Sequence, residues 1–368
     1  MRALTCDFDY QFTMNAPTQP TDQTEIEGSR FEVRGEGTDF IIRTADGAEL
    51  FVHRFLLHQT SPIFATLLSL PQPVEPELCS HTQPTLVDKQ KDGLPTVEVS
   101  ETKAVWNAIL HMLYHFDLPE PSSPYDIRPV LEAARKYELD GITTRLRLTL
   151  SHAIYTAAWD PTAVYAVASM YGLADVALQA ARATLGTPVH ELYTRELRDV
   201  PAHVLQRLLA FRWRCQEAAR GVAAFSTTTT RTGLYKRIDW LPRTDFTFFE
   251  CSCGAGAVSC SIMGEGEFKL YAGRTYWKEY MERAEQVLKE RPVGVAVKDP
   301  GIIMPAMRTA GHCVSCGRRI YLDMMDFTEY LAAAVDVATA SVSLSVTLQC
   351  RVPHTYVAVD NPGNIKAS

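Results

Sequence analysis

Two closely spaced cysteine pairs are the part of this 368-residue sequence best suited to chemistry. Cys313 and Cys316 are separated by two residues and followed by Gly317, and Cys251 and Cys253 are separated by one. Structural zinc sites take four tetrahedral thiolate or imidazole ligands, often supplied as two close pairs from distant segments. The sequence therefore predicts a structural Zn²⁺ site whose four ligands are these two cysteine pairs.

Several aspects of this zinc prediction stay open at the level of sequence. The single residue between Cys251 and Cys253 is a less usual spacing than two, and Cys260 and His312 are spare candidate ligands. Four reduced thiols in loops, without a metal, are the main alternative, and a redox or iron–sulfur role is a lesser one. A tight turn at Gly317 is expected to aim the second pair of sulfurs at one ion. We also expect a loop-rich region with few long helices, so that metal binding would supply part of its folding energy.

A zinc-dependent enzyme is an alternative of another class, and the sequence favours it less. Catalytic zinc sites leave one coordination position open and keep a general base nearby. Zinc deaminases combine His-x-Glu with Pro-Cys-x-x-Cys, whereas "GHCVSC" has no such partner and His190-Glu191 lacks the spacing. Asp39 and His53 could pair as acid and imidazole, but such residues at strand ends are more often structural. We therefore expect no catalytic residues and no enzyme.

The composition is that of a globular protein with more than one domain. Hydrophobic residues make up 46% of the chain, charged residues 21%, and the formal net charge is −7, which leaves no basic surplus for a phosphate backbone. We expect other proteins as partners, with no direct nucleic-acid binding. No apolar run is long enough for a membrane span. Nine cysteines without an export signal favour a reducing compartment, cytoplasmic or nuclear.

The order of predicted elements indicates an α+β domain followed by helices. A disordered tail is expected over residues 1–30. Two strands joined by a two-residue turn at Asp46-Gly47, a short helix over "RFLLHQ", a second helix beginning at Ser61-Pro62, another strand and three further helices fill residues 31–150. An all-helical extension follows over residues 151–225, in which Pro161 directly follows the predicted N-cap residue Asp160.

The last third of the chain differs in kind from the helical part. The polar stretch 226–233, "STTTTRTG", is predicted to be a linker. Residues 234–345 form a small cysteine-containing module, expected to be stabilised by zinc, with amphipathic helices near "TYWKEYMERAEQVLKERP" and "MMDFTEYLAAAVDVATA". A tail is expected over residues 346–368.

A longer pattern runs through residues 39–150. It begins with "DFII" and continues with "FVHRFLLHQTSPIF", followed by "PTVEVSETKAVWNAILHMLY" and "VLEAARKYELDGI". Within the second stretch, the residues that match this pattern are His53, Leu56, Leu57, Ser61 and Phe64. This arrangement resembles the BTB/POZ family, whose fold is a small sheet flanked by helices. Residues 160–222 are similar to the BACK-like helices that often follow such domains, and the whole layout looks like the large BTB set of mushroom-forming fungi.

The resemblance implies a non-enzymatic adaptor or scaffold that binds other proteins. One use in the family is as a substrate adaptor for a cullin-type ubiquitin ligase, and the alternative is a transcription-associated regulator. Dimeric members carry a helix and an exchangeable strand before the position of Asp39, where "EGSRFEVRGEG" supplies at most a short strand. Homodimerisation is therefore left open.

Overall fold

The computed structural model describes most of the chain and divides it into two compact units. The described residues are 30–70, 93–117, 121–224, 226–230, 233–253, 257–264 and 267–344. Unit 1 comprises Met1–Glu120 with Pro129–Thr143, and unit 2 comprises Pro121–Arg128 with Thr144–Ser368. The predicted tail at 346–368, and all but residue 30 of the predicted tail at 1–30, lie outside the described residues. The predicted domain limits at 150, 225 and 345 stay predictions.

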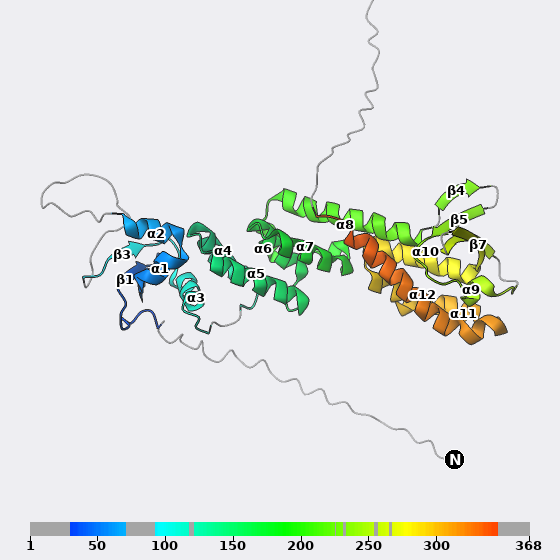
Figure 1. Ribbon diagram of the computed structural model, residues 1–368, viewed down its shortest axis with the longest axis horizontal. Helices are drawn as coiled ribbons and strands as arrows, with labels where there is room; N and C mark the ends of the chain where they lie inside the picture. The colour runs from blue at the N-terminus through cyan, green and yellow to red at the C-terminus, as the bar shows by residue number, and fades with distance from the viewer. Residues whose placement is uncertain are drawn as a thin grey trace, which may run out of the picture. The chain divides into compact units, whose positions relative to one another are not determined.

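Unit 1 is built on a three-stranded sheet with helices around it (Figure 1). Its elements are β1 (Phe40–Arg43), β2 (Glu49–Val52), α1 (Arg54–Thr60), α2 (Pro62–Ser69), β3 (Thr96–Glu98) and α3 (Lys103–Leu113). Helices α4 (Pro124–Lys136) and α5 (Asp140–Tyr155) contribute residues to both units. The strand order is β2-β1-β3, with β1 antiparallel to β2 and parallel to β3. The expected α+β fold, a small sheet flanked by helices, is confirmed.

The hairpin of unit 1 forms where the apolar runs and the Asp-Gly signal predicted it, but its turn is longer. Arg43 pairs with Glu49, so residues 44–48 form the connection rather than two residues alone. Gly47 has a φ of 81° in this loop, a conformation that glycine adopts without strain. Asp46 accepts hydrogen bonds from the backbone N–H of Lys103 at 3.0 and 3.1 Å. The turn therefore also caps α3, which a purely local reading of the turn does not reveal.

Aromatic rings fill the core of unit 1. The ring of Phe64 stacks on Tyr137 with centroids 5.1 Å apart and meets Trp106 edge-on at 5.8 Å. Ser61 begins α2 as predicted, because its hydroxyl accepts from the backbone N–H of Phe64. The same hydroxyl donates to the carbonyl of Tyr137. One buried serine thus joins the start of α2 to the end of α4.

Unit 2 contains the helical extension, a four-stranded sheet and the last four helices. Its elements are α6 (Pro161–Met170), α7 (Ala174–Ala183), α8 (Ala202–Ala223), β4 (Ser226–Thr230), β5 (Gly233–Ile238), α9 (Thr247–Glu250), β6 (Ala257–Gly264), β7 (Glu267–Arg274), α10 (Thr275–Glu290), α11 (Pro300–Ala310) and α12 (Val314–Ala340). Four short 3₁₀ helices lie at Thr184–Gly186, Val189–Glu191, Arg195–Asp199 and Gly294–Lys298. The strands are ordered β4-β5-β6-β7. Helix α8 runs alongside α10 and α12 (Figure 1).

The C-terminal part of unit 2 has a larger core than the sequence suggested. Helix α12 is 27 residues long and α10 is 16. Both bury large side chains, such as Trp277 and Phe327, in one cluster that Ala219 of α8 also joins. The expectation of a loop-rich region with few long helices was therefore wrong. Burial of this apolar cluster stabilises the region by itself, apart from any contribution of a metal.

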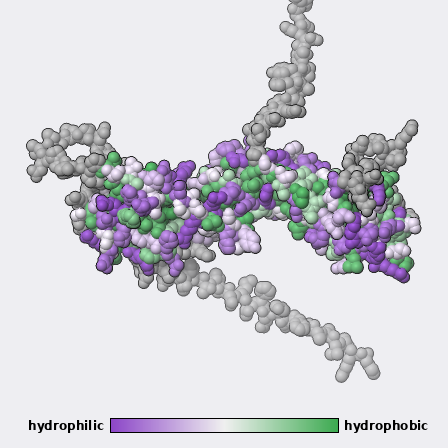
Figure 2. All heavy atoms as spheres, viewed as in Figure 1, coloured by the Kyte–Doolittle hydropathy of each residue, from purple (hydrophilic) through white to green (hydrophobic). Residues whose placement is uncertain are grey.

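Two further observations concern the stretch 226–233 and the protein surface. Ser226 and the four threonines at 227–230 form strand β4 where a linker was predicted, since β-branched residues favour extended structure and β5 provides a partner. Among the described residues, no helix is both long and apolar enough to cross a membrane. The visible face in Figure 2 mixes hydrophilic and hydrophobic residues rather than showing one broad apolar band.

Candidate metal centre

The first half of the candidate centre lies at the beginning of helix α12. Cys313 is the N-cap residue of this helix, and Cys316 lies in its first turn. Gly317 is helical, with its N–H bonded to the carbonyl of Cys313 at 2.8 Å. The predicted tight turn at Gly317 was therefore wrong. The helical turn itself directs both sulfurs of the pair to the same side.

The second half of the centre follows the short helix α9. Cys251 is the C-cap of α9, and its backbone N–H bonds to the carbonyl of Thr247 at 2.9 Å. The backbone N–H of Cys253 donates to the sulfur of Cys251 at 3.4 Å. The loop between the two cysteines thus folds back so that both sulfurs face α12. Gly254, the residue after this pair, lies outside the described residues.

The structure brings the four sulfurs together. Cys251 Sγ lies 3.7 Å from Cys313 Sγ, and Cys253 Sγ lies 3.8 Å from Cys316 Sγ. All four sulfurs lie within 4.8 Å of one another. Four thiolates bound to one zinc at about 2.3 Å in a tetrahedron would have sulfurs about 3.8 Å apart. The cluster is therefore arranged as a closed four-thiolate metal site requires, and it could hold a metal ion.

The two spare ligands of the sequence analysis do not belong to this cluster. Cys260 lies on β6, where it is buried and its thiol donates to the carbonyl of Tyr271 at 3.6 Å. Burial raises the pKa of Cys260 to about 12, which keeps this thiol protonated. His312 is exposed, one residue before the N-cap of α12.

The two cysteines of α12 have opposite electrostatic environments. The backbone N–H of Cys316 donates toward the Cys313 sulfur at the helix N-terminus and lowers the pKa of Cys313 to about 7, against the effect of partial burial. Burial raises the pKa of Cys316 to about 12. Metal coordination requires deprotonated thiols, so a bound cation would have to release the proton of Cys316.

Side chains of α12 hold the segment that carries Cys251 and Cys253. The buried carboxylate of Asp323 accepts from both the backbone N–H and the hydroxyl of Thr247, each at 2.7 Å. Arg319 donates to the carbonyl of Asp245 at 2.7 Å and forms an ion pair with Glu250 at 3.3 Å. These bonds hold α9 against α12 without any contribution from a metal. The four thiols are thus preorganised by protein contacts.

Two further groups surround the sulfurs. The buried hydroxyl of Tyr276 donates to Cys316 Sγ at 3.4 Å, and the guanidinium of Arg274 donates to the carbonyl of Cys253 at 3.2 Å. Hydrogen bonds of this kind orient metal ligands and tune the metal. A donated bond to Cys316 would also offset part of the negative charge that a fourth thiolate adds.

The sequence analysis did not identify Asp323, Tyr276 or Arg319 as parts of this region. The signal for Asp323 was weak, because it lies seven residues after Cys316 and directly precedes Met324, where the predicted helix begins. Buried carboxylates are uncommon unless they have partners. No comparable signal in the sequence links Tyr276 to the cysteines.

The other candidate pair, Asp39 and His53, does not form an acid–imidazole contact. Asp39 accepts from the backbone N–H of Arg54 at 2.7 Å and so caps the start of α1. His53 Nδ1 lies 2.8 Å from the hydroxyl of Tyr114, which also accepts from the backbone N–H of His53. Both side chains therefore stabilise the junction of β2 and α1.

Comparison with known proteins identifies one family. Residues 29–153 match the family described as the BTB/POZ domain. A search of curated proteins found no match to the chain. The chain thus contains a BTB/POZ domain, with a small sheet flanked by helices, and continues with a helical extension and a cysteine cluster in its C-terminal region.

Proposed function

We infer, from the BTB/POZ domain at residues 29–153, that the protein is a non-enzymatic adaptor that joins other proteins. BTB/POZ domains act in general by binding proteins, and the matched domain is the observation that carries this conclusion. The candidate metal centre supports the same conclusion. Four thiolates saturate a tetrahedral ion, which leaves no position for a reacting water.

Unit 1 offers exposed apolar side chains on which a partner could dock. Phe55 on α1 is 72% exposed, Ile63 on α2 is 39% exposed, and Leu70 directly after α2 is 60% exposed. Helices α1 and α2 are adjacent in the fold (Figure 1). A large aromatic side chain in solvent is a typical anchor for a protein interface. We therefore propose that Phe55 contributes to the docking face of this domain.

The first partner to test is the scaffold subunit of a cullin-type ubiquitin ligase. Binding of the purified full-length chain to the amino-terminal domain of a cullin would be measured by biolayer interferometry. We expect saturable binding that Phe55→Ser weakens about tenfold or more, since burying a phenylalanine contributes about 1.5–3 kcal/mol. Val33→Ser is the matched control, because Val33 is 73% exposed in the same unit but lies outside α1 and α2.

If the chain does not bind a cullin, it is not a substrate adaptor of a cullin-type ligase. The remaining candidate is then an adaptor that acts as a transcription-associated regulator. Quantitative affinity capture from the native cell then tests the adaptor role itself. We expect specific proteins that wild type and Val33→Ser retain and that Phe55→Ser loses. Equal recovery with all three chains would overturn the proposed docking face, and no enrichment above background would overturn the adaptor role.

We further propose that Cys251, Cys253, Cys313 and Cys316 bind one structural Zn²⁺. Soft thiolates in a tetrahedral arrangement favour zinc or an iron–sulfur cluster over harder metals, and the sulfur separations of 3.7 and 3.8 Å suit a single ion. The ion would join the loop after α9 to the start of α12. In this role zinc would keep unit 2 rigid while unit 1 binds its partner.

A further inference from the structure

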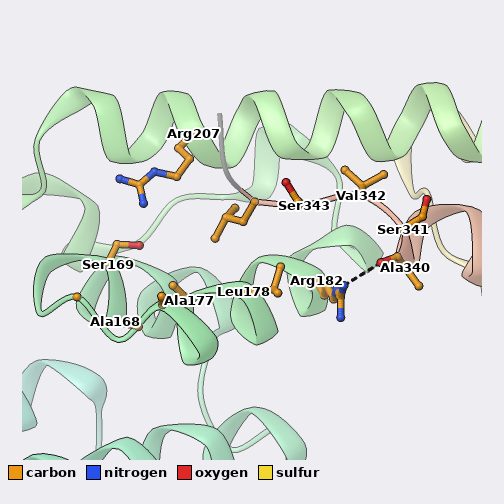
Figure 3. A pocket seen from close by; sticks show the side chains of 13 residues that line it. Ala168, Ser169, Ala177, Leu178, Arg182, Arg207, Ala340, Ser341, Val342 and Ser343 are labelled. Atoms are coloured by element: carbon orange, nitrogen blue, oxygen red, sulfur yellow. Dashed lines mark hydrogen bonds between the residues drawn. The ribbon is translucent and has the colours of Figure 1, made fainter. Parts of the chain in front are cut away.

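A cavity of about 490 Å³ lies within unit 2, away from the cysteines. It is open to solvent on one side and is lined by residues of α6, α7, α8 and the segment that follows α12 (Figure 3). Small side chains on α6 and α7, such as Ala168 and Ala177, leave this space unfilled. Its volume lies within the range of about 300–1,000 Å³ that is usual for small-molecule sites.

The charged groups around this cavity are all positive. Arg182 of α7 and Arg207 of α8 line it, and no acidic residue does. The half-buried Arg207 has no ion pair or hydrogen bond with any residue in the part of the chain that the structure describes. A guanidinium that is partly removed from water and has no protein partner is suited to a bound anion.

The two arginines have different roles in the cavity. Figure 3 shows Arg207 at one end, and Arg182 at the other end with its dashed bond to Ala340. This bond, from the guanidinium to the carbonyl, is 2.9 Å long. Arg182 thus fastens the end of α12, whereas Arg207 is the guanidinium whose donors have no partner among the described residues.

Apolar atoms form most of the cavity wall between Arg182 and Arg207. Ala177 and Leu178 of α7 lie on one side of the cavity, and Val342 of the segment after α12 lies on the other (Figure 3). An aliphatic body of moderate length fits such walls, because apolar contact removes its surface from water. A purely inorganic anion would leave these walls unused.

We propose that this cavity binds a small amphiphilic carboxylate. The carboxylate forms paired hydrogen bonds with the planar guanidinium of Arg207, a geometry that a carboxylate matches well. Its aliphatic chain lies along Ala177 and Leu178 toward Arg182.

The test uses the full-length protein and octanoate as the probe, below its micelle concentration. Saturation-transfer NMR and calorimetry measure its binding beside octanol and octylammonium, which carry the same chain without the negative charge. We expect saturable binding of octanoate, binding of octanol about tenfold weaker or less, and none of octylammonium. Ala177→Leu fills the cavity and should abolish binding of octanoate.

Two arginine variants separate the proposed site from non-specific attraction. Arg207→Gln should weaken octanoate binding about tenfold or more and leave octanol binding unchanged. Arg308→Gln is the control, because Arg308 is exposed on α11 and lies outside the cavity. Thermal denaturation of each variant establishes that it is folded. No saturable binding to wild type, or equal octanoate binding by wild type and Arg207→Gln, would overturn the proposal. Occupation of the cavity by residues 345–368 would give the first of these results.

Discussion

Replacing Cys316 with Ser should remove the metal from the protein. Cys316 is fully buried, and its sulfur lies 3.8 Å from that of Cys253. A serine hydroxyl has nearly the same shape but stays protonated, so the variant keeps the helix start and loses one thiolate of the four. A structural site needs all four ligands to close around zinc. We expect less than one tenth of the wild-type metal content.

The loss of metal should also lower the melting temperature by about 8–16 °C. A ligand that binds only the folded state at a free concentration a thousandfold above its Kd stabilises that state by about 4.1 kcal/mol. For a unit of about 150–250 residues, each kcal/mol shifts the melting temperature by about 2–4 °C. Unfolding of unit 2 is not expected, because most of the buried residues in the apolar core that its helices share are not cysteines, such as Trp277 and Phe327.

Metal analysis by mass spectrometry and scanning calorimetry measure the two effects on the same samples. Cys260→Ser is the matched control, because Cys260 is also buried but lies outside the cluster. A chelator should lower the melting temperature of wild type and Cys260→Ser but not that of Cys316→Ser. Equal metal content in all three proteins, or an equal response to the chelator, would refute the assignment.

Three further substitutions test other parts of the account. Asp323→Ala removes both hydrogen bonds to Thr247 of α9 and should weaken metal binding about tenfold to a hundredfold. Competition with a chromophoric chelator measures this affinity. An unchanged affinity would mean that α9 does not position Cys251. Ser61→Ala removes the cap of α2 and should destabilise unit 1 by about 2 kcal/mol; hydrogen exchange in β1 measures this, and unchanged protection would contradict it. For Glu101, burial raises the carboxyl pKa, but its bonds to Lys136 and Tyr137 outweigh burial and leave the pKa below its usual 4.5. The ionised carboxylate of Glu101 therefore stabilises the fold above pH 4.5, and this stabilisation is lost as the pH falls through the lowered pKa of the folded state. Glu101→Gln should be less stable at pH 7 and lose less stability on acidification; an unchanged pH dependence of urea unfolding would refute this.

The sequence predicted those parts of the fold that depend on local patterns. The Asp-Gly turn signal, the Ser61-Pro62 helix start and the short apolar runs around Ile41 and Val52 all indicated elements that the structure contains. Such patterns depend on neighbours within a few residues. Leu56 is only half-buried, and Leu57 takes the core position beside it.

Features that depend on distant partners were harder to predict. Ser226 and the threonines at 227–230 have the polarity of a linker, and only pairing with β5 makes them a strand. The spacing of the two cysteine pairs pointed to a common site, and the structure brings their sulfurs within 4.8 Å; their role as metal ligands is still a prediction. The bonds of Asp323 and Tyr276 connect segments 76 and 40 residues apart, which no local pattern reveals.

X-ray absorption at the zinc edge, on the full-length protein as purified from its native cell, tests the metal centre most directly. The account predicts one zinc per chain, surrounded by four sulfur atoms at about 2.3 Å. Absence of zinc, or an oxygen or nitrogen atom in place of one sulfur, would contradict a closed four-thiolate centre.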